Sequence, residues 1–383
     1  MDTGRYGTRG VVALLPFLVK GALSLSVLRA MRTRGLDITL AHQWAAAPGY
    51  TTDPASDFAA DDRLLDLSLK GGGGDLEALD AVIEARDVGL VLQIGAPGAY
   101  AMLPYLKERH PGLQIVDTLY NEVGHTVDHF LYENCLDAVI VESWHMSRFV
   151  ERRSAKAGPR IAVVESGIDL EHYTPRSSGP ARDDLVLGYI GRMSPEKNPL
   201  GFVKLAEQLA PDHPGVSFVL FGEGGMTDEV KARIAASGLD DRIRFEGYFD
   251  DVRDGLASID ALVVPSLVDG RPNIIMEANA FGRPVLATAV GGIPELIDNG
   301  RNGHLISLGD IDGVGSILRD WTTDRAGFAA LAASSRDTAL ARFDRRRMLD
   351  AYEATFRSFL GSEPAPIPPA REYASAEPCL NIT

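Results

Sequence analysis

The sequence has few cysteines, and its basic residues are outnumbered by its acidic ones. Only two cysteines, Cys135 and Cys379, occur among 383 residues, which provides neither a disulfide framework nor a zinc-ligand spacing. We therefore expect a reduced, cytoplasmic setting. Lysine and arginine number 38 against 53 aspartates and glutamates, a net charge of −15 at pH 7. This balance argues against a nucleic-acid partner and against a strong general attraction to anionic lipid.

Long apolar runs are also missing, with one segment as the nearest exception. Residues Val11–Leu28 are nearly all apolar and follow two arginines. Lys20, Pro16 and Gly21 interrupt this run, so a strand, a tight turn and a helix explain it better than a signal peptide does. No other stretch is long and apolar enough to span a membrane.

The sequence does contain a regular alternation of short apolar runs and helical patterns. Hydrophobic residues make up 45% and charged residues 24%, as in a globular protein. The alternation predicts repeated β-α-β units and parallel sheets. Strands are expected near 11–17, 37–42, 88–94, 113–117, 138–141, 161–164, 185–190, 217–221, 243–246, 261–265, 284–288 and 303–306. Helices are expected near 21–34, 75–86, 98–110, 127–134, 146–157, 199–209, 226–237, 274–280, 312–321, 325–343 and 346–360.

A chain of 383 residues exceeds what one hydrophobic core usually supports, so we expect two domains. Two prolines, two serines and a glycine lie together in TPRSSGPARDD, which predicts a linker at 174–184. The resulting domains are residues 1–173 and 185–345. A closing helix at 346–360 is expected to return to the first domain, and the proline-rich tail at 361–383 is expected to be loose.

Charged loops directly after strands are the first candidates for a ligand-binding site, because doubly wound sheets bind ligands beyond the carboxyl ends of their strands. Gly191 begins the segment GRMSPEKN, in which Arg192 and Lys197 supply two cations. Such a loop suits a diphosphate, for which arginine offers a planar fork and lysine a compact charge. A solvated loop explains the same residues about equally well. FGEGG is a weak dinucleotide signal, because Thr227 stands in place of the third glycine of the fingerprint.

The strongest pattern is DGRPNIIME, in which Asp269 and Glu277 are separated by seven residues. Residues 270–273 predict a turn that leads into a helix starting near Ile274. The start of a helix presents N–H groups that hold phosphate or sugar oxygens. A carboxylate accepts two hydroxyls at once, which suits a ribose or hexose diol. The alternative is that Asp269 caps the turn and Glu277 pairs with a lysine.

Together these motifs resemble the retaining glycosyltransferases of family 4, of the group 1 type, which have the GT-B fold. The second half carries, in the family's order, GRMSPEKN, FGEGG, RFEGY, DGRPNIIMEANAFGRPVLAT and GGIPELI. In the first half, PFLVKGA resembles the family's glycine loop, and VVESGIDLEHYTP the segment leading into its linker. The resemblance implies an α/β fold of two Rossmann-like doubly wound domains facing across a cleft. It also implies transfer of a sugar from a nucleotide-diphosphate sugar to an acceptor hydroxyl, with retained configuration.

The resemblance assigns roles to individual residues. Arg192 and Lys197 would bind the donor diphosphate, and Glu277 the ribose hydroxyls. The donor sugar would contact Asp269, where the family usually has glutamate, so the choice of donor sugar is the open point. The remaining expected contacts are Tyr248 at the base, His125 beside the reacting sugar, Gly21 at the diphosphate, and Gly191, Gly270, Arg271, Pro272, Asn273 and Ile274 around the donor.

Two patterns raise the question of a metal. His125, His129 and Glu133 are spaced by four residues, as on one face of a helix, and an exposed polar face explains them better than a metal site. The only D-x-D triplet, at 310–312, is interpreted as surface or as a helix cap. We therefore expect a metal-independent enzyme without a cofactor, whose substrate is a UDP- or GDP-linked sugar.

The acceptor is less defined than the donor. The resemblance implies a glycan, a lipid-linked molecule or a small molecule in glycan, glycolipid, polysaccharide or other glycoconjugate biosynthesis. Four basic residues lie on one predicted helix, and a solvated face explains them better than contact with lipid head groups. They are Arg148, Arg152, Arg153 and Lys156. We expect a cytoplasmic protein, with peripheral contact at the inner face of the membrane as the alternative.

Other functions share parts of this pattern. A nucleotide-sugar epimerase has the same two-domain architecture in some cases, and a non-catalytic nucleotide-sugar binder would fit if Asp269 marks decay. A nicotinamide dehydrogenase fits less well, because neither half opens with G-x-G-x-x-G.

Overall fold

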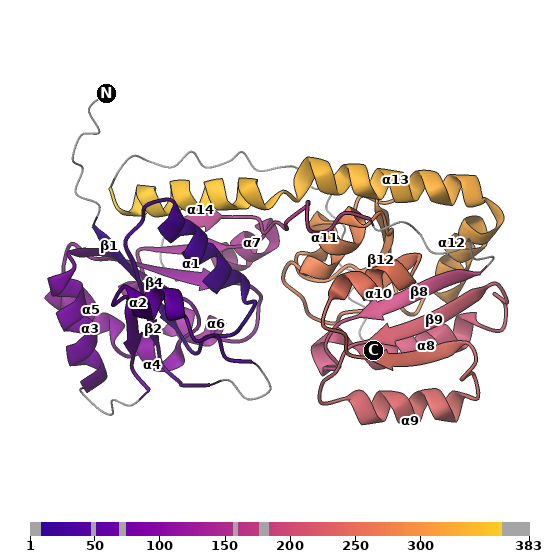
Figure 1. Ribbon diagram of the computed structural model, residues 1–383, viewed down its shortest axis with the longest axis horizontal. Helices are drawn as coiled ribbons and strands as arrows, with labels where there is room; N and C mark the ends of the chain where they lie inside the picture. Colours follow the sequence, from indigo (N-terminus) through magenta and orange to yellow (C-terminus); the bar gives the residue numbers. More distant parts are fainter. Residues whose placement is uncertain (1–8, 47–50, 69–73, 156–159, 176–183, 362–383) are drawn as a thin grey trace. The chain divides into compact units, whose positions relative to one another are not determined.

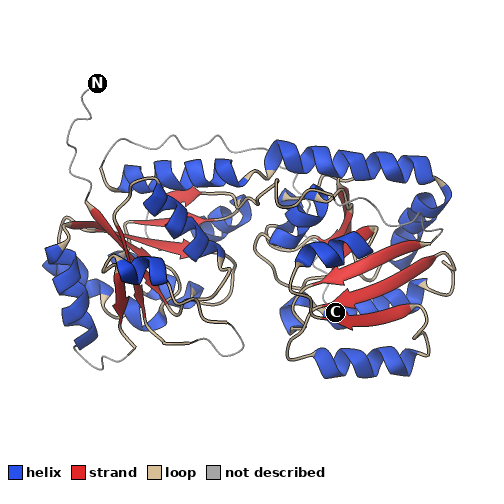
Figure 2. Cartoon of the chain, viewed as in Figure 1, coloured by secondary structure: helices blue, strands red, loops and turns tan. Residues whose placement is uncertain are grey.

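The computed structural model forms two compact units (Figures 1 and 2). It describes residues 9–46, 51–68, 74–155, 160–175 and 184–361. The first unit contains the described residues up to Glu165 together with those from Met348 onward, and the second unit is Ser166–Arg347. This boundary lies before the predicted linker at 174–184, most of which falls outside the described residues.

The first unit is built on a seven-stranded sheet whose strand pairs are all parallel. Its strands are β1 Gly10–Leu15, β2 Ile38–His42, β3 Leu64–Asp66, β4 Val88–Gln93, β5 Gln114–Leu119, β6 Ala138–Val141 and β7 Ile161–Val163. Their order is β3-β2-β1-β4-β5-β6-β7. The direction of the order reverses between β1 and β4, as in a doubly wound sheet.

Helices cover both faces of this sheet. They are α1 Leu23–Thr33, α2 Ser56–Ala60, α3 Gly74–Ala85, α4 Pro97–Tyr100, α5 Leu103–Arg109, α6 Thr126–Leu131, η1 Glu133–Cys135, α7 Trp144–Arg153 and α14 Arg345–Phe359. Alternate residues of β1 face opposite sides, so Val11 and Ala13 pack with α1 while Val12 and Leu14 pack with α3, α4 and α5. Burial on both faces explains why these strands are continuous apolar runs in the sequence.

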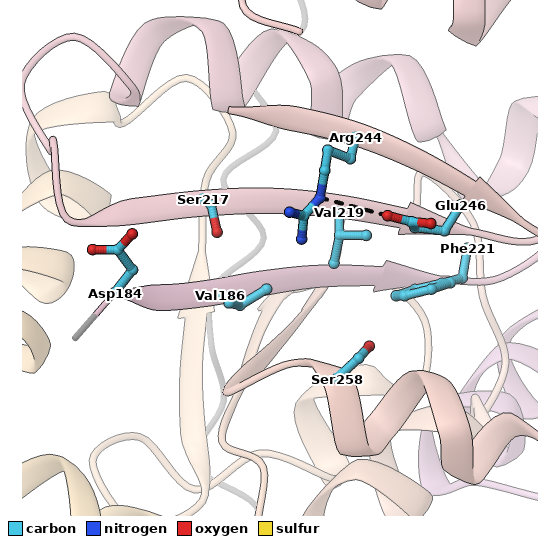
Figure 3. Close-up of a pocket in the computed structure, with 8 residues that line it drawn as sticks. All are labelled: Asp184, Val186, Ser217, Val219, Phe221, Arg244, Glu246 and Ser258. Carbon is cyan, nitrogen blue, oxygen red and sulfur yellow. Dashed lines mark ion pairs between the residues drawn. The ribbon is translucent and has the colours of Figure 1, made fainter. Parts of the chain in front are cut away.

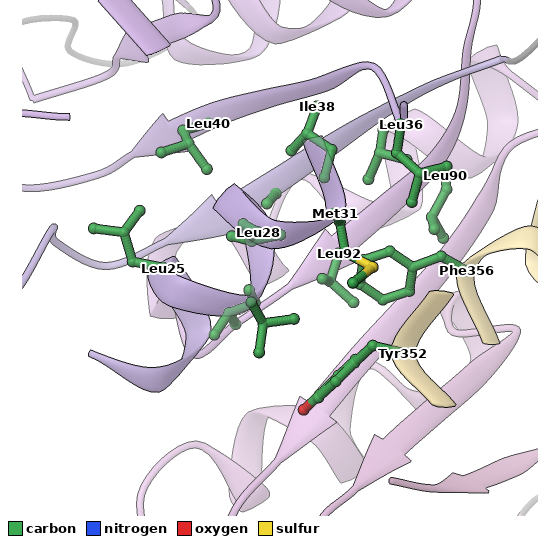
Figure 4. Close-up of a cluster of buried hydrophobic side chains, with 14 of the residues drawn as sticks. Leu25, Leu28, Met31, Leu36, Ile38, Leu40, Leu90, Leu92, Tyr352 and Phe356 are labelled. Atoms are coloured by element: carbon green, nitrogen blue, oxygen red, sulfur yellow. The ribbon is translucent and has the colours of Figure 1, made fainter. Parts of the chain in front are cut away.

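The last helix, α14, belongs to the core of the first unit. Leu28 and Met31 of α1 lie three residues apart on its apolar face, and Tyr352 and Phe356 of α14 pack into the same cluster (Figure 4). Each of these side chains is buried, which contributes about 1.5–3 kcal/mol per side chain. The first unit is therefore completed by a segment from the far end of the sequence.

The second unit repeats the architecture with a six-stranded sheet, again with parallel pairs. Its strands are β8 Leu185–Ile190, β9 Val216–Phe221, β10 Ile243–Gly247, β11 Ala261–Val264, β12 Val285–Thr288 and β13 Gly303–Ile306, in the order β10-β9-β8-β11-β12-β13. The helices are η2 Pro195–Lys197, α8 Pro199–Leu209, α9 Thr227–Ser237, α10 Val252–Ser258, α11 Asn273–Ala280, η3 Ile293–Glu295, α12 Ile311–Thr323 and α13 Arg325–Arg342. The predicted α/β class with two doubly wound sheets is confirmed.

The structure departs from the predicted elements in a few places. The helix expected near 98–110 is two helices, α4 and α5, with Pro104 in the first turn of α5. Proline lacks an N–H and favours the start of a helix, which explains the break. The short elements α2, β3 and α10 were not predicted. Within the described residues, no helix has the length and apolarity needed to cross a membrane.

Candidate active site

The loops after β8 and β11 border a cavity of about 210 Å³ in the second unit. These two strands are neighbours at the point where the strand order reverses, which is where doubly wound sheets bind ligands. The cavity is lined by Tyr189, Ile190, Gly191, Lys197, Val263, Val264, Pro265, Ser266, Asp269, Pro272, Asn273 and Ile274. The structure thus brings residues from the two strongest sequence motifs to one place.

An ion pair joins the two motifs inside this cavity. Lys197 Nζ lies 2.6 Å from Asp269 Oδ2, and Ser266 Oγ donates to the same carboxylate oxygen at 3.0 Å. The Asp269 side chain is only 9% exposed and that of Lys197 24% exposed. The lysine is therefore held in a fixed position beside partly enclosed space, which favours it as a cation for an anionic ligand.

Backbone geometry fixes the loop that carries Lys197. Asn198 has a left-handed conformation (φ 55°), and its side chain caps α8 by accepting from the Gly201 amide. The Asn198 side chain also donates to the carbonyl of Pro265 at 3.0 Å, at the end of β11. A second tie is the Leu267 amide, which donates to the Glu196 carbonyl at 2.8 Å. Asparagine tolerates the left-handed region better than most residues, so it can turn the chain and tie the loops together.

A glycine makes room for the turn that follows Asp269. Gly291 has φ 53°, and a Cβ at this position would lie 1.7 Å from the Asp269 carbonyl oxygen. The neighbouring Gly292 amide donates to the Gly270 carbonyl at 2.8 Å. The turn leads into α11, so Asn273 and Ile274 place the first residues of that helix on the cavity wall. This is the helix start that the sequence predicted as a phosphate or sugar contact.

Arg271 differs from its neighbours in the turn. Its side chain is only 2% exposed, and its Nη1 lies 3.9 Å from the carboxylate of Glu295, which is 3% exposed. Arg271 is also not among the residues that line the cavity. Its guanidinium therefore lies toward η3, on the side of the turn away from the cavity. Only the backbone of Arg271 belongs to the predicted donor turn.

Arg192 has the opposite character. Its side chain is 58% exposed and forms an ion pair of 3.2 Å with Glu196 on the same loop. An exposed pair of this kind contributes little to stability, and the guanidinium is accessible to a ligand. Arg192 and Lys197 thus lie on one loop, but only Lys197 lines the 210 Å³ cavity.

Glu277, at the other end of the motif, has a partner that the sequence did not predict. The hydroxyl of Tyr173 donates to Glu277 Oε1 at 2.9 Å. Burial raises the pKa of Glu277 to about 7, and the Tyr173 hydrogen bond opposes this rise. Because burial and Glu277 also raise the pKa of Tyr173, the phenol remains protonated and can donate. Only the position of Tyr173 in GIDLEHYTP, a segment already linked to the family, could have signalled this contact.

Tyr173 also lines a second cavity, of about 510 Å³. The other lining residues are His172, Tyr248, Phe249, Asp250, Asp251, Val252 and Arg253. Tyr248, the residue predicted to face the base, is 66% exposed, and its ring is stacked with that of Phe249. An aromatic wall with an exposed ring is suited to stacking against a nucleobase.

His125 lies in the first unit, just before α6 and after β5. Its Nε2 lies 2.8 Å from the carbonyl oxygen of Thr118, so Nε2 carries the proton and donates. Gly95, with φ 70°, lies beside the other ring nitrogen, since a Cβ there would come within 2.9 Å of Nδ1. The predicted contact of His125 with the reacting sugar remains a prediction.

Gly21 lies in the turn before α1, as predicted. Its φ of 81° is a conformation that glycine adopts without strain, and no atom of the described residues lies within 4 Å of the place where a Cβ would be. The backbone is therefore open to a close approach at this turn. Its contact with a diphosphate also remains a prediction.

The expectation of an exposed polar face at His125, His129 and Glu133 is wrong. His129 is buried (4% exposed), and its Nδ1 lies 2.6 Å from the fully buried carboxylate of Asp117. Glu133 lies in η1, beyond the end of α6, and accepts from the Ser154 hydroxyl at 2.8 Å. The spacing of four failed because α6 ends at Leu131, so the three residues do not share one helix.

The other predictions concern the D-x-D triplet, the basic residues of one helix and the question of a metal. Asp310 caps α12 by accepting from the Gly313 amide at 3.0 Å, so its interpretation as a helix cap is confirmed. Arg148, Arg152 and Arg153 are exposed on α7, and Lys156 lies outside the described residues. Among the described residues there is no group of three or more histidines, cysteines or carboxylates that could hold a metal ion.

A larger cavity, of about 710 Å³, lies elsewhere in the second unit, over β8, β9 and β10 (Figure 3). It is lined by Asp184, Val186, Ser217, Val219, Phe221, Arg244, Glu246 and Ser258. None of the predicted site residues is among them. Arg244 and Glu246 of β10 form an ion pair of 3.5 Å with each other. The smaller cavity at the strand ends is the better candidate for the active site, because charged loops from two motifs line it.

Two Rossmann-like units with parallel sheets are the architecture of the GT-B fold. Solved structures of glycosyltransferases have the same architecture. A glycosyltransferase from Rickettsia africae superposes with a TM-score of 0.76 at 17% identity, covering 94% of this chain and 100% of that one. Anabaena HepE in complex with UDP superposes with a TM-score of 0.73 at 20% identity, covering 91% of this chain and 100% of that one.

The family comparison points in the same direction. Residues 184–324 match the family model described as glycosyl transferases group 1. The predicted resemblance to glycosyltransferases of the group 1 type is thereby confirmed, and the matched segment contains both GRMSPEKN and DGRPNIIME.

Curated relatives resemble parts of the chain. One is the UDP-Gal:alpha-D-GlcNAc-diphosphoundecaprenol alpha-1,3-galactosyltransferase of Escherichia coli, 31% identical over 178 residues, which are 43% of this chain and 46% of that relative. Another is the lipopolysaccharide core biosynthesis glycosyltransferase LpsE of Rhizobium meliloti, 32% identical over 152 residues, 40% of this chain and 44% of that relative. The chain thus spans less than half the length of these two relatives.

Proposed function

We propose that this protein is a retaining glycosyltransferase. It moves a sugar from a nucleotide-diphosphate sugar to an acceptor hydroxyl and needs no metal ion. The observation that carries the proposal is the Lys197–Asp269 pair, 2.6 Å apart, in the cavity where the strand order of the second unit reverses. A cation held by a carboxylate beside the first turn of α11 is suited to a diphosphate next to a sugar.

The chemistry that this arrangement supports is charge stabilisation. As the bond between the anomeric carbon and the diphosphate oxygen breaks, negative charge builds up on the leaving group. Lys197 and Arg192 would stabilise this charge, and the amides at the start of α11 would add partial positive charge. The acceptor hydroxyl forms the new bond on the same face, and its proton passes to an oxygen of the leaving diphosphate. No residue is then needed as a covalent nucleophile.

The proposed substrates follow from the same site and from the names of the relatives. UDP-linked sugars are the first choice of donor, because a relative of known activity and a bound structural neighbour are both named with UDP. The acceptor is proposed to be a glycan or a lipid-linked saccharide. On this proposal the protein acts in the cytoplasm, with a peripheral contact at the inner face of the membrane.

Two measurements test the proposal. A thermal-shift screen with UDP, GDP, ADP and their sugars comes first, since a ligand at one hundred times its dissociation constant stabilises by about 2.7 kcal/mol. Transfer from the donor that binds is then measured with lipid-linked and free saccharide acceptors, and the anomeric configuration of the product is read by NMR. Absence of binding by every nucleotide, an inverted product, or an epimerised donor without transfer each contradicts the proposal.

A further inference from the structure

Tyr173 connects the wall of the 510 Å³ cavity to a carboxylate on α11. Its ring is part of the wall of the 510 Å³ cavity, together with Tyr248 and Phe249, while its hydroxyl reaches Glu277 Oε1 on α11 at 2.9 Å. A phenylalanine would fill the same space in the wall. What the hydroxyl adds to this packing is a hydrogen-bond donor to a carboxylate.

The segment that carries Tyr173 is fixed to the second unit by its backbone. The Ile168 amide donates to the carbonyl of Phe343 at 2.8 Å, and the Arg345 amide donates back to the carbonyl of Ile168 at 2.9 Å. Arg336 of α13 donates to the carbonyl of Tyr173 at 2.9 Å and also to that of Ala280, at the last residue of α11. The phenol is therefore held at a set position relative to α11.

Among the described residues, the charged groups that act on this contact come from α10 and α13. Tyr173 is the hydrogen-bonding partner of Glu277, and Asp251 and Arg253 at the start of α10 act on the Tyr173 side. From α13, Arg336 faces backbone carbonyls. Burial raises the pKa of Glu277 to about 7, and donation by Tyr173 favours the ionised form. The Tyr173 hydroxyl therefore favours charge on Glu277 near neutral pH, against the effect of burial.

We infer that Tyr173 is a positioning residue that orients Glu277 and favours its ionised form, so that the carboxylate accepts the ribose hydroxyls of a nucleoside diphosphate. This inference rests on the proposed function. Tyr173 engages Oε1, and Glu277 remains partly exposed, so the carboxylate can still accept hydroxyls from a ligand. A ribose that lacks its 2′-hydroxyl offers one donor fewer and should bind less tightly.

Calorimetric binding of UDP and 2′-deoxy-UDP to the full chain tests this inference. We expect the unaltered protein to prefer UDP by about 10- to 150-fold, which is the loss of one hydrogen bond to a charged group. In Tyr173→Phe at pH 7, the affinity for UDP should fall by about three- to tenfold, and the preference over the deoxy nucleotide should shrink. Both should recover at pH 8.5, because Glu277 ionises at a higher pH without its donor.

Two variants serve as references. Glu277→Gln should bind UDP weakly at every pH from 6 to 8.5 and show little preference for the 2′-hydroxyl. Tyr105→Phe removes a phenol hydroxyl from the exposed surface of the first unit and should match the unaltered protein.

The outcomes distinguish a failure of the proposed function from a failure of the inference about Tyr173. If the unaltered protein binds none of UDP, GDP and ADP, the proposed function fails and the inference fails with it. If the unaltered protein binds UDP, but Tyr173→Phe keeps the same affinity and pH midpoint, only the inference is overturned. An equal loss of affinity at every pH is also evidence against it, because that result indicates a packing role.

Discussion

The two units place polar groups at the carboxyl ends of their strands in opposite ways. In the second unit, Lys197 and Asp269 form a pair on the wall of a cavity, and Glu277 remains partly exposed. In the first unit, the carboxylate of Asp117 near the end of β5 is fully buried. It accepts from the Tyr100 hydroxyl at 2.8 Å, from His129 Nδ1 at 2.6 Å and from the Thr118 amide at 2.8 Å.

This difference separates groups kept for a ligand from groups used within the fold. A buried carboxylate with three donors is satisfied internally and holds β5, α4 and α6 together. A carboxylate that lines a cavity together with a lysine is instead accessible to a ligand. Substitutions in the first network should therefore act on stability, and substitutions in the second unit's site on turnover and binding.

The largest effect is expected from Asp117→Ala. The change leaves Tyr100 and His129 buried without their acceptor, which should lower the free energy of unfolding by about 3–5 kcal/mol. Urea unfolding measures this in a Trp321→Phe background, in which Trp44 and Trp144 report on the first unit. Asp350→Ala, which removes a carboxylate that is 70% exposed, is the control and should cost no more than about 1 kcal/mol. Equal losses in both variants contradict the structural role of Asp117.

The next effect is on catalysis. Lys197→Ala removes the fixed cation from the cavity and should lower turnover by on the order of a hundred- to a thousandfold, while the unfolding transition stays near that of the unaltered protein. Lys204→Ala, an exposed lysine on α8, is the matched control and should transfer sugar at a normal rate. Near-normal turnover in the Lys197 variant removes the basis for the diphosphate site.

The sequence predicted the second unit better than the first, for a physical reason. The cavity around Asp269 is lined by short motifs that directly follow strands, so GRMSPEKN and DGRPNIIME suffice to predict that Lys197 and Asp269 lie together. The network around Asp117 joins β5 to side chains from two separate helices, and such pairings leave no local pattern. Tyr173 was missed in the same way, because its hydroxyl meets Glu277 across 104 positions of sequence.

The sequence also failed to predict the direction in which some side chains point. Arg271 stands in the middle of the predicted donor turn, but its guanidinium is buried near Glu295. His129 was assigned to an exposed face and instead is buried against Asp117. The spacing placed Glu133 on the wrong element because α6 ends at Leu131, and spacing alone does not tell whether a helix face is exposed or buried.

A third prediction concerns pH and stability. The pKa of Glu277 is raised to about 7 in the folded protein, so the folded state prefers the protonated form. The stability from this preference is present below the unfolded pKa near 4.5 and is lost as the pH rises through about 7. Glu277→Gln should therefore be more stable than the unaltered protein at pH 8, by roughly 1–3 kcal/mol, and the difference should vanish near pH 4.5.

Thermal or urea unfolding of the two proteins from pH 4.5 to 8 measures this trend. Glu229→Gln, at an exposed position on α9, is the control and should differ from the unaltered protein by about 0.5 kcal/mol or less at every pH. A stabilised variant that no longer binds nucleotide would mark Glu277 as a group kept for a ligand at the expense of stability. A Glu277→Gln variant that is less stable at pH 8 instead would place Glu277 with Asp117, among the groups used within the fold.

The smallest effect is expected from lengthening the carboxylate that departs from the resembled family. Asp269→Glu keeps a negative partner for Lys197 but moves the carboxylate by one methylene, a change worth about 1–3 kcal/mol in discrimination between similar substrates. We expect transfer to continue, with the ranking of UDP-glucose, UDP-galactose and UDP-N-acetylglucosamine altered by roughly tenfold in kcat/KM. Asp269→Asn keeps the length and removes the charge, so it should lower turnover with every donor alike. If both variants lower turnover equally without changing the ranking, Asp269 acts only by holding Lys197, and the donor sugar is selected elsewhere.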